Sequence, residues 1–217
     1  MPKKRNATKG ARTRAMLKQV ARNLFEVDGH SGVTAQAIVE AAGISSGTFY
    51  VYFSNKDEIL FEISRDFFDE IIKILAAGRN YFSDFENICL GHYIYINHVA
   101  ANWDFFRSLT SYSFFNTDLL KIARDARLKE AERTAAYLLT RWSQHDGTAP
   151  EVDTQGAVKM AMALHAMTEG FLQDELTSLP PGTKPDDAEV RGLALYMGRL
   201  FYRAAFLEEP PKIDFNP

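Results

Sequence analysis

Apolar side chains recur at helical spacing along nearly all of this 217-residue chain. In the first such segment, apolar residues follow the i, i+3, i+4, i+7, i+8 pattern of an amphipathic helix: Leu17, Val20, Ala21, Leu24 and Phe25. We find no alternating apolar and polar run, bounded by turn signals, that would indicate a sheet. The pattern therefore predicts an all-α protein of about nine helices.

The turn and cap signals place these helices along the chain. The first helix ends close to Gly29, and a short second helix begins after Thr34 and stops before Gly43. A long helix is predicted from Asn55 to about Gly78, with a capping sequence at its start. Later helices are predicted over about 83–101, 103–113, 117–144, 153–177 and 186–208.

The segment between Gly43 and Ser54 has the composition of a strand, because aromatic and β-branched residues fill it. A lone strand there would leave its backbone groups unpaired. In a helix, Phe49 and Phe53 fall on one side and Gly47 on the opposite side, at about 100° per residue. We therefore predict a short helix over residues 44–53 that packing of the two phenylalanines holds in place.

Two short helices joined by a turn at Gly43 form a helix-turn-helix, whose second helix enters the major groove of DNA. Gly47 would let the backbone approach a duplex closely, and Lys56 would anchor a phosphate at the start of the next helix. Hydroxyl groups near the same face suit phosphate oxygens or base edges: Ser45, Ser46, Thr48, Tyr50 and Tyr52.

Residues 30–60 resemble the DNA-binding signature of the TetR family of transcriptional repressors. The similarity rests on Thr34, an Ala-Gly turn, and the run GTFYVYFSNKDEI over residues 47–59, in which Tyr52 replaces a frequent histidine. The resemblance implies a three-helix DNA-binding domain over 1–54 and a larger helical effector-binding and dimerisation domain over 55–217. It also implies DNA contacts by Thr34, Gln36, Ser46, Gly47, Thr48, Tyr50, Tyr52 and Lys56.

Charge is unevenly distributed, although the formal net charge is only −3. The first 22 residues hold eight Lys or Arg and no Asp or Glu, which suits a polyanionic partner. Residues 1–10 are predicted to be a flexible basic arm. This arm, with Arg12 and Arg14, either reaches the neighbouring DNA groove or backbone or is a solubilising tail.

The two helices predicted over 153–177 and 186–208 are candidates for a homodimer interface. Residues 157–172 are apolar nearly all round, which indicates burial on several sides. A twofold dimer would bind two operator half-sites, and the resemblance supports this role. The alternative is that both helices belong to the core of one monomer.

The middle of the chain is rich in aromatic residues, which either form plain core or line a cavity. The resemblance implies an effector pocket here, and an apolar cavity with a few polar groups is typical of small-molecule sites. We expect a small lipophilic effector that releases the DNA operator by a population shift. The expected lining residues are His92, Tyr93, Trp103, Phe106, Tyr112, Phe115 and Met167.

The sequence favours a DNA-binding regulator over other classes. The histidines lie in no recognisable catalytic motif, and the single Cys89 excludes a cysteine-based zinc cluster. No cofactor or metal is implied, and no apolar run approaches the ~18 residues of a membrane span. We expect a repressor in the bacterial cytoplasm, associated with the nucleoid, that binds a pseudo-palindromic operator. The alternatives are a non-specific architectural DNA-binding protein without an effector, or an enzyme housed in the helical body.

Overall fold

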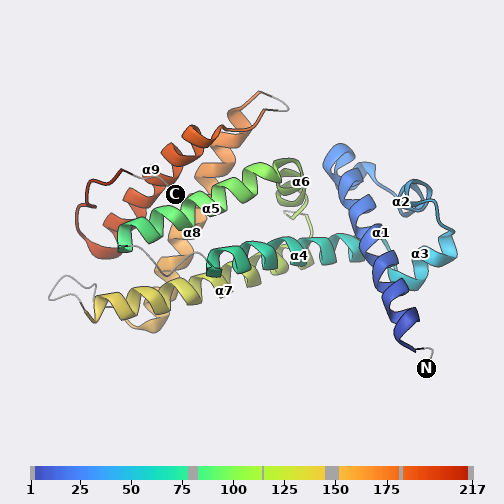
Figure 1. Ribbon diagram of the computed structural model, residues 1–217, viewed down its shortest axis with the longest axis horizontal. Coiled ribbons are helices and arrows are strands. Elements are labelled where there is room, and N and C mark those ends of the chain that lie inside the picture. The colour runs from blue at the N-terminus through green and yellow to red at the C-terminus, as the bar shows by residue number, and fades with distance from the viewer. Residues whose placement is uncertain (1–2, 78–82, 114, 145–151, 181–182, 215–217) are drawn as a thin grey trace. The chain divides into compact units, whose positions relative to one another are not determined.

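The computed structural model describes residues 3–77, 83–113, 115–144, 152–180 and 183–214, with side chains from residue 9 onward. Every regular element in these ranges is a helix (Figure 1), which confirms the predicted all-α fold. The bounds from residue 84 onward agree with the prediction to within a few residues. The helices are α1 (Lys3–Gly32), α2 (Ala35–Ala42), α3 (Ser46–Tyr52), α4 (Lys56–Ala77), α5 (Asp84–Ala101), α6 (Trp103–Ser113), α7 (Thr117–Trp142), α8 (Thr154–Ser178) and α9 (Asp187–Phe206).

Backbone contacts divide the chain into two compact units. Unit 1 comprises Met1–Phe68 and Asp104–Ala123, and unit 2 comprises Asp69–Trp103 and Arg124–Pro217. Unit 1 extends beyond residues 1–54 because the Phe67 ring of α4 packs on Phe105 and Phe106 of α6, with centroids 5.6 and 6.1 Å away. The boundary predicted between a DNA-binding domain (1–54) and an effector-binding and dimerisation domain (55–217) concerns function, not backbone contacts. It stays a prediction.

Helix α1 differs from the prediction at its N-terminal end. It begins at Lys3, where a flexible arm was predicted over residues 1–10. Lys, Ala and Arg are abundant in this segment and are strong helix formers, so the helix extends toward the N-terminus. At the other end Gly29 has φ 64° and ψ 172°, which breaks the helical path where the sequence analysis expected it to stop.

Arg14 joins α1 to the rest of unit 1. Its Nε donates to a carboxylate oxygen of Glu62 at 3.0 Å, and its Nη1 donates to the backbone oxygen of Tyr52 at 3.1 Å. The guanidinium also lies 4.6 Å from the ring centroid of Phe53. The hydrogen bond to Glu62 raises the pKa of Arg14 above its ordinary value. Arg14 therefore belongs to the packing of unit 1, rather than to the basic arm with which it was grouped.

Helices α2 and α3 form the predicted helix-turn-helix. The hydroxyl of Thr34 caps α2 by accepting a hydrogen bond from the amide of Ala37 at 3.0 Å. Gly43 ends α2 in the left-handed conformation, with φ 64° and ψ 34°, which glycine adopts without a Cβ clash. Ser45 then caps α3. The strand-like segment is thus a helix over residues 46–52.

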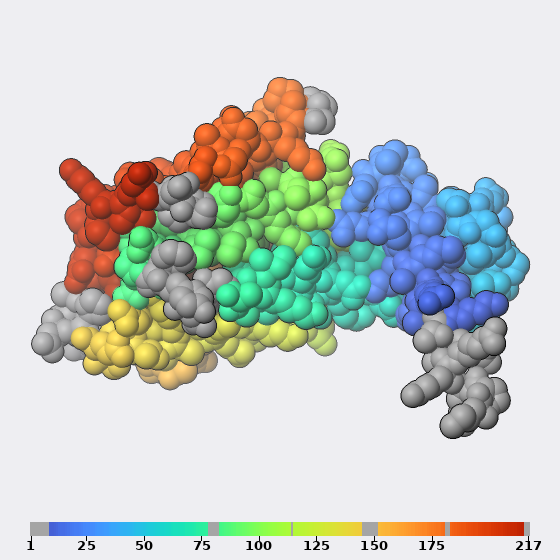
Figure 2. Space-filling model, in the orientation of Figure 1, coloured from blue at the N-terminus to red at the C-terminus, as the bar shows by residue number. Residues whose placement is uncertain are grey.

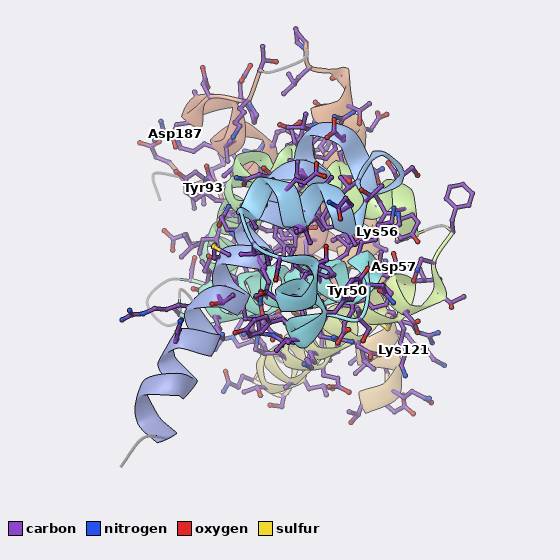
Figure 3. All side chains as sticks on the ribbon, turned by 90° about the vertical axis from the view of Figure 1, so that its right-hand side faces the viewer. Tyr50, Lys56, Asp57, Tyr93, Lys121 and Asp187 are labelled. Atoms are coloured by element: carbon purple, nitrogen blue, oxygen red, sulfur yellow. The ribbon has the colours of Figure 1, made fainter. Side chains whose placement is uncertain are left out.

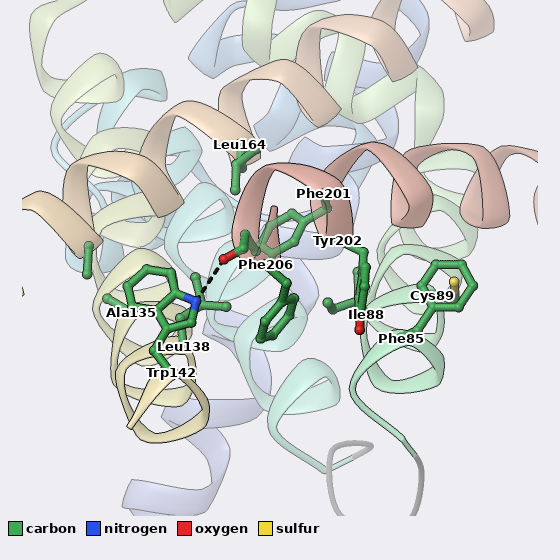
Figure 4. Close-up of a cluster of buried hydrophobic side chains, with 12 residues drawn as sticks. Phe85, Ile88, Cys89, Ala135, Leu138, Trp142, Leu164, Phe201, Tyr202 and Phe206 are labelled. Carbon is green, nitrogen blue, oxygen red and sulfur yellow. Dashed lines mark hydrogen bonds between the residues drawn. The ribbon is translucent and has the colours of Figure 1, made fainter. Parts of the chain in front are cut away.

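The core of unit 2 lies between α5, α7, α8 and α9 (Figure 4). The indole Nε1 of Trp142 donates to the backbone oxygen of Ala205 at 2.7 Å, which ties the end of α7 to α9. Helices α5 and α9 lie side by side (Figure 1). Cys89 is buried between them, and burial raises the pKa of its thiol to about 12, so this group is an inert part of the core.

Candidate nucleic-acid interface

One face of helix α3 is buried in unit 1, and another face of the same helix is exposed. Phe49 has 0% exposure, Phe53 is also buried, and their ring centroids are 6.0 Å apart. Tyr50 is 59% exposed, and Val51 is exposed as well. A helix of seven residues is too short to be stable alone, so the two buried rings hold it in place. The predicted orientation of α3 is confirmed.

The small hydroxyl side chains at the start of α3 are linked to one another and to α2. Ser45 Oγ accepts from the amide of Thr48 at 3.2 Å and lies 2.9 Å from the Thr48 hydroxyl. The Ser46 hydroxyl is 3.5 Å from Gln36 Oε1, and the amide of Gln36 donates to Glu40 at 2.8 Å. The light-blue atoms of α2 and α3 form an outer surface of unit 1 (Figure 2). These polar groups are therefore pre-positioned and accessible.

Gly47 and Tyr50 lie on this outer surface of α3. A Cβ at Gly47 would meet only Ser45 Oγ within 4 Å, at 3.9 Å, so no neighbour in the described chain requires a glycine there. Tyr50, labelled in Figure 3, is three residues further along the helix. Its hydroxyl makes no hydrogen bond within the described residues. Tyr52 is half-buried and lies toward α1, where a Cβ on Gly10 would be 3.6 Å from its hydroxyl oxygen.

Lys56 differs from the other predicted DNA contacts because its side chain is turned into the protein. The ammonium group donates to the backbone oxygens of His30 and Val33, at 2.8 and 2.7 Å. These bonds satisfy carbonyl groups at the end of α1 and in the turn that follows. Two of the three ammonium hydrogens are thereby used. In this structure Lys56 holds the end of α1 and the following turn by these two hydrogen bonds. Its role as a phosphate anchor stays a prediction.

The start of α4 is capped as the sequence indicated, with Asn55 as the capping residue. Asn55 Oδ1 accepts from the amide of Glu58 at 2.9 Å. The amide of Ser54 donates to the Glu58 carboxylate at 2.5 Å, which lowers the pKa of Glu58. These two bonds fix the start of α4 directly after α3.

His30 is a buried residue of unit 1 to which the sequence analysis gave no role. Its Nε2 lies 2.5 Å from a carboxylate oxygen of Asp57. Burial lowers the pKa of His30, and this effect exceeds the opposing effect of the bond to Asp57. The imidazole is therefore neutral near pH 7 and donates its Nε2 hydrogen to the carboxylate. No local motif could have revealed this, because the partners are 27 residues apart.

The seven expected effector-lining residues divide between the two units. Phe106 and Tyr112 belong to unit 1, and the others, apart from the 87% exposed Phe115 of unit 1, belong to unit 2. The Tyr93 hydroxyl donates to Asp187 at 2.6 Å on the surface of unit 2 (Figure 3). Their role as an effector pocket remains a prediction; the remaining members are the buried His92, the half-buried Trp103 and the exposed Met167.

Within the described ranges, no three His, Cys, Asp or Glu side chains come together as a metal site would require. None of the helices in the same ranges has both the length and the apolar character needed to cross a membrane.

The helix-turn-helix and its exposed face identify the family. Residues 18–63 match the model described as "Bacterial regulatory proteins, tetR family". This match assigns residues 18–63, which include the helix-turn-helix, to the TetR family. The chain is 26% identical over 176 residues to the HTH-type transcriptional regulator YdgC of Bacillus subtilis (strain 168), covering 76% of this chain and 84% of YdgC.

Two further relatives extend the similarity beyond residues 18–63. It is 25% identical over 189 residues to the transcriptional repressor KstR2 of Rhodococcus jostii (strain RHA1), covering 71% of this chain and 90% of KstR2. The solved structure of the fatty acid degradation regulator FadR from Bacillus halodurans has the same fold, with a TM-score of 0.68 at 15% identity. That match covers 87% of this chain and 94% of FadR.

Proposed function

We propose that this TetR-family regulator is a repressor that binds a pseudo-palindromic operator as a homodimer and leaves it when a small lipophilic molecule binds. The observation that carries the proposal is the outward face of α3, where Gly47 lies on the side away from the buried Phe49 and the side chain of Tyr50 is 59% exposed. The exposed residues of α3 are poor helix formers and add little to the stability of this short helix. Contact with the major groove of DNA would give these exposed residues a function.

The proposed DNA contacts comprise groups that read the duplex and groups that position it. Tyr50 and Gly47 would face base edges or the adjacent backbone, and the hydroxyl groups would bind phosphate oxygens. The proposed set is Thr34, Gln36, Ser45, Ser46, Gly47, Thr48, Tyr50, Tyr52 and Lys56.

We assign the dimer interface to α8 and α9. Between Lys159 and Asp174, the exposed residues of α8 are small or apolar, which suits close packing between subunits. Tyr196 of α9 is exposed and its ring lies 5.5 Å from that of Phe171 of α8. These exposed residues of α8 are Ala163, Ala166, Met167 and Gly170. A twofold axis through this surface would place the α3 helices of the two subunits so that each binds one operator half-site.

The names of two relatives support repression and a lipophilic effector. KstR2 is described as a repressor, and FadR as a regulator of fatty acid degradation. Release of the operator requires that the effector prefer a state in which the two reading helices do not fit successive major grooves. We place the protein in the bacterial cytoplasm, where such operators are found.

A binding experiment with a matched control tests the proposal. Operator fragments are selected from the parent genome, and their affinity is measured by fluorescence anisotropy at fixed salt with random DNA as competitor. Tyr50→Ala should lower operator affinity by at least about tenfold, because one good contact carries about 1–3 kcal/mol. Val27→Ala, at an exposed position of α1, should leave the affinity unchanged. Sedimentation should show a dimer for both variants.

Lys56→Ala is unsuitable as the first test of the contact surface. It would leave the His30 and Val33 carbonyl groups without their donor and so disturb the fold of unit 1. Equal affinity of wild type and Tyr50→Ala would reject the assigned surface. Equal affinity of the wild type for operator and random DNA would instead favour the non-specific alternative.

A further inference from the structure

The exposed face of α3 includes a valine, Val51, to which the sequence analysis assigned no DNA contact. Its side chain is 77% exposed. Val51 follows the buried Phe49 by two residues, which places it about 160° around the helix from that ring. Gly47 precedes Val51 by one turn on the same side and has no side chain of its own. The two methyl groups of Val51 therefore lie near the middle of the face that points away from the core of unit 1.

A valine is an unfavourable choice at this position for the isolated protein. It is a weaker helix former than alanine because it is branched at Cβ, and its exposed methyl groups gain nothing from burial. A single exposed apolar side chain is common on protein surfaces. Val51, however, lies on the second helix of the helix-turn-helix, whose seven residues are too few for a stable helix alone. Methyl groups that become buried on a bound duplex would account for the valine.

Helix α3 lacks the side chains that recognise guanine, adenine and cytosine most specifically. Arginine or lysine binds guanine, asparagine or glutamine binds adenine, and aspartate or glutamate binds cytosine. None of these six residue types occurs in the sequence SGTFYVY of α3. Its hydroxyl groups can bind more than one base, whereas an apolar group contacts the C5-methyl of thymine. The composition of α3 therefore favours thymine as the base that it distinguishes.

The segments on either side of α3 add no free cation to this face. No Lys or Arg occurs in the sequence between Arg22 and Lys56. The ammonium group of Lys56 donates to two backbone carbonyl groups, and the side-chain amide of Gln36 donates to Glu40. These polar groups are already bonded within unit 1. Apolar contact is thus the main means by which α3 can distinguish one base pair from another.

We propose that Val51 contacts the C5-methyl group of a thymine in each operator half-site and makes α3 selective for a T·A pair at that position. The contact is favourable because it removes methyl groups of both partners from water. Gly47 permits it, since no side chain one turn earlier holds the helix away from the duplex. The inference rests on the proposed function, because it requires α3 to lie in the major groove.

Deoxyuridine is the probe, because it lacks the C5-methyl group of thymidine and keeps the same base pairing and the same O4 acceptor. Each thymine of the selected operator is replaced in turn, in both half-sites together, and affinity is measured by fluorescence anisotropy at fixed salt. At one symmetry-related pair of positions, the wild type should bind more than about tenfold more weakly. Each buried methyl group accounts for about fourfold, and the dimer contacts two.

Val51→Ala removes the two methyl groups that make the contact. This variant should bind the thymine and deoxyuridine operators with affinities within about twofold of each other, which gives a double-mutant cycle between side chain and base. Val27→Ala is the matched control, because Val27 of α1 is 82% exposed, and it should keep the full preference for thymine. Alanine is the better helix former, so thermal melting of Val51→Ala should show no loss of stability.

The possible results distinguish this contact from the proposed function. If deoxyuridine has no effect at any position while the operator is still preferred over random DNA, the thymine contact is rejected and the proposed function stands. If Val51→Ala keeps the thymine preference of the wild type, another group contacts the methyl and the inference is overturned. Equal affinity of the wild type for operator and random DNA would reject the proposed function, and the thymine contact with it.

Discussion

The imidazole ring of His30 stacks on the phenol ring of Tyr112, with centroids 3.5 Å apart and planes inclined by 20°. His30 is only 8% exposed and follows the break in α1, and Tyr112 lies near the end of α6. The stack joins segments that are far apart in sequence and explains why residues 104–123 belong to unit 1. Tyr112 was also expected to contact an effector, and that role stays a prediction.

Removal of the Tyr112 ring should destabilise unit 1. Tyr112→Ala should lower the free energy of unfolding by about 1–3 kcal/mol, because it removes a ring stack and leaves His30 partly uncovered. Tyr112→Phe keeps the stack and should cost less than about 1 kcal/mol. Urea unfolding followed by circular dichroism gives both values. Equal stability of the two variants would show that the stack contributes little.

The stability of unit 1 should fall as the pH is lowered below neutrality. The pKa of His30 is lowered from 6.5 by burial and by the nearby Lys56, while Asp57 opposes the shift. Between the folded and unfolded pKa values, the unfolded chain binds more protons than the folded chain, so unfolding becomes easier as the pH falls through 6.5. His30→Gln removes this titration. Its free energy of unfolding should fall less steeply from pH 7 to 5.5, by up to about 1 kcal/mol per pH unit.

The pH dependence of the free energy of unfolding, measured for wild type and His30→Gln, tests this prediction. Urea midpoints of wild type and His30→Gln are compared at matched ionic strength. Parallel slopes would mean that His30 does not titrate between the two states in this range. A steeper slope in the variant would reverse the assigned direction of the pKa shift.

Local signals in the sequence were sufficient for the helices and for the orientation of α3. Caps and glycines mark the helix ends, and the spacing of Phe49 and Phe53 places both rings on one face. A strand over residues 48–53 could be rejected because no partner strand is available. These conclusions depend only on neighbours within a few residues, which is why they could be reached without coordinates.

Long-range partners could not be predicted in the same way. Lys56 looked like a phosphate anchor, but its ammonium binds carbonyl groups more than 20 residues earlier. Arg14 looked like part of a basic arm, but Glu62 is 48 residues away in the sequence. Helical periodicity specifies which face of a helix is buried, and it does not specify which other helix covers that face.

The close packing of α5 and α9 should be sensitive to one methyl group. A Cβ at Gly198 would lie 2.6 Å from the sulfur of Cys89 and 3.4 Å from its Cα. Gly198→Ala should therefore push the two helices apart and cost about 1–3 kcal/mol. Gly91→Ala is the matched control, because a Cβ there meets nothing within 4 Å, and it should stabilise α5 by about 0.5–1 kcal/mol. Equal urea midpoints for the two variants would contradict the close contact.

Gly47 offers a test in which stability and DNA affinity should change in opposite directions. Within the protein a methyl group at this position has room, since the nearest atom would be Ser45 Oγ at 3.9 Å. Gly47→Ala should thus stabilise α3 by up to about 1 kcal/mol, because alanine is the better helix former. The same methyl group would stand between α3 and a bound duplex and should weaken operator binding by about tenfold or more. Thermal melting and anisotropy titration of one preparation give both quantities. A variant that is more stable and binds the operator as well as the wild type would show that this face of α3 does not approach DNA closely.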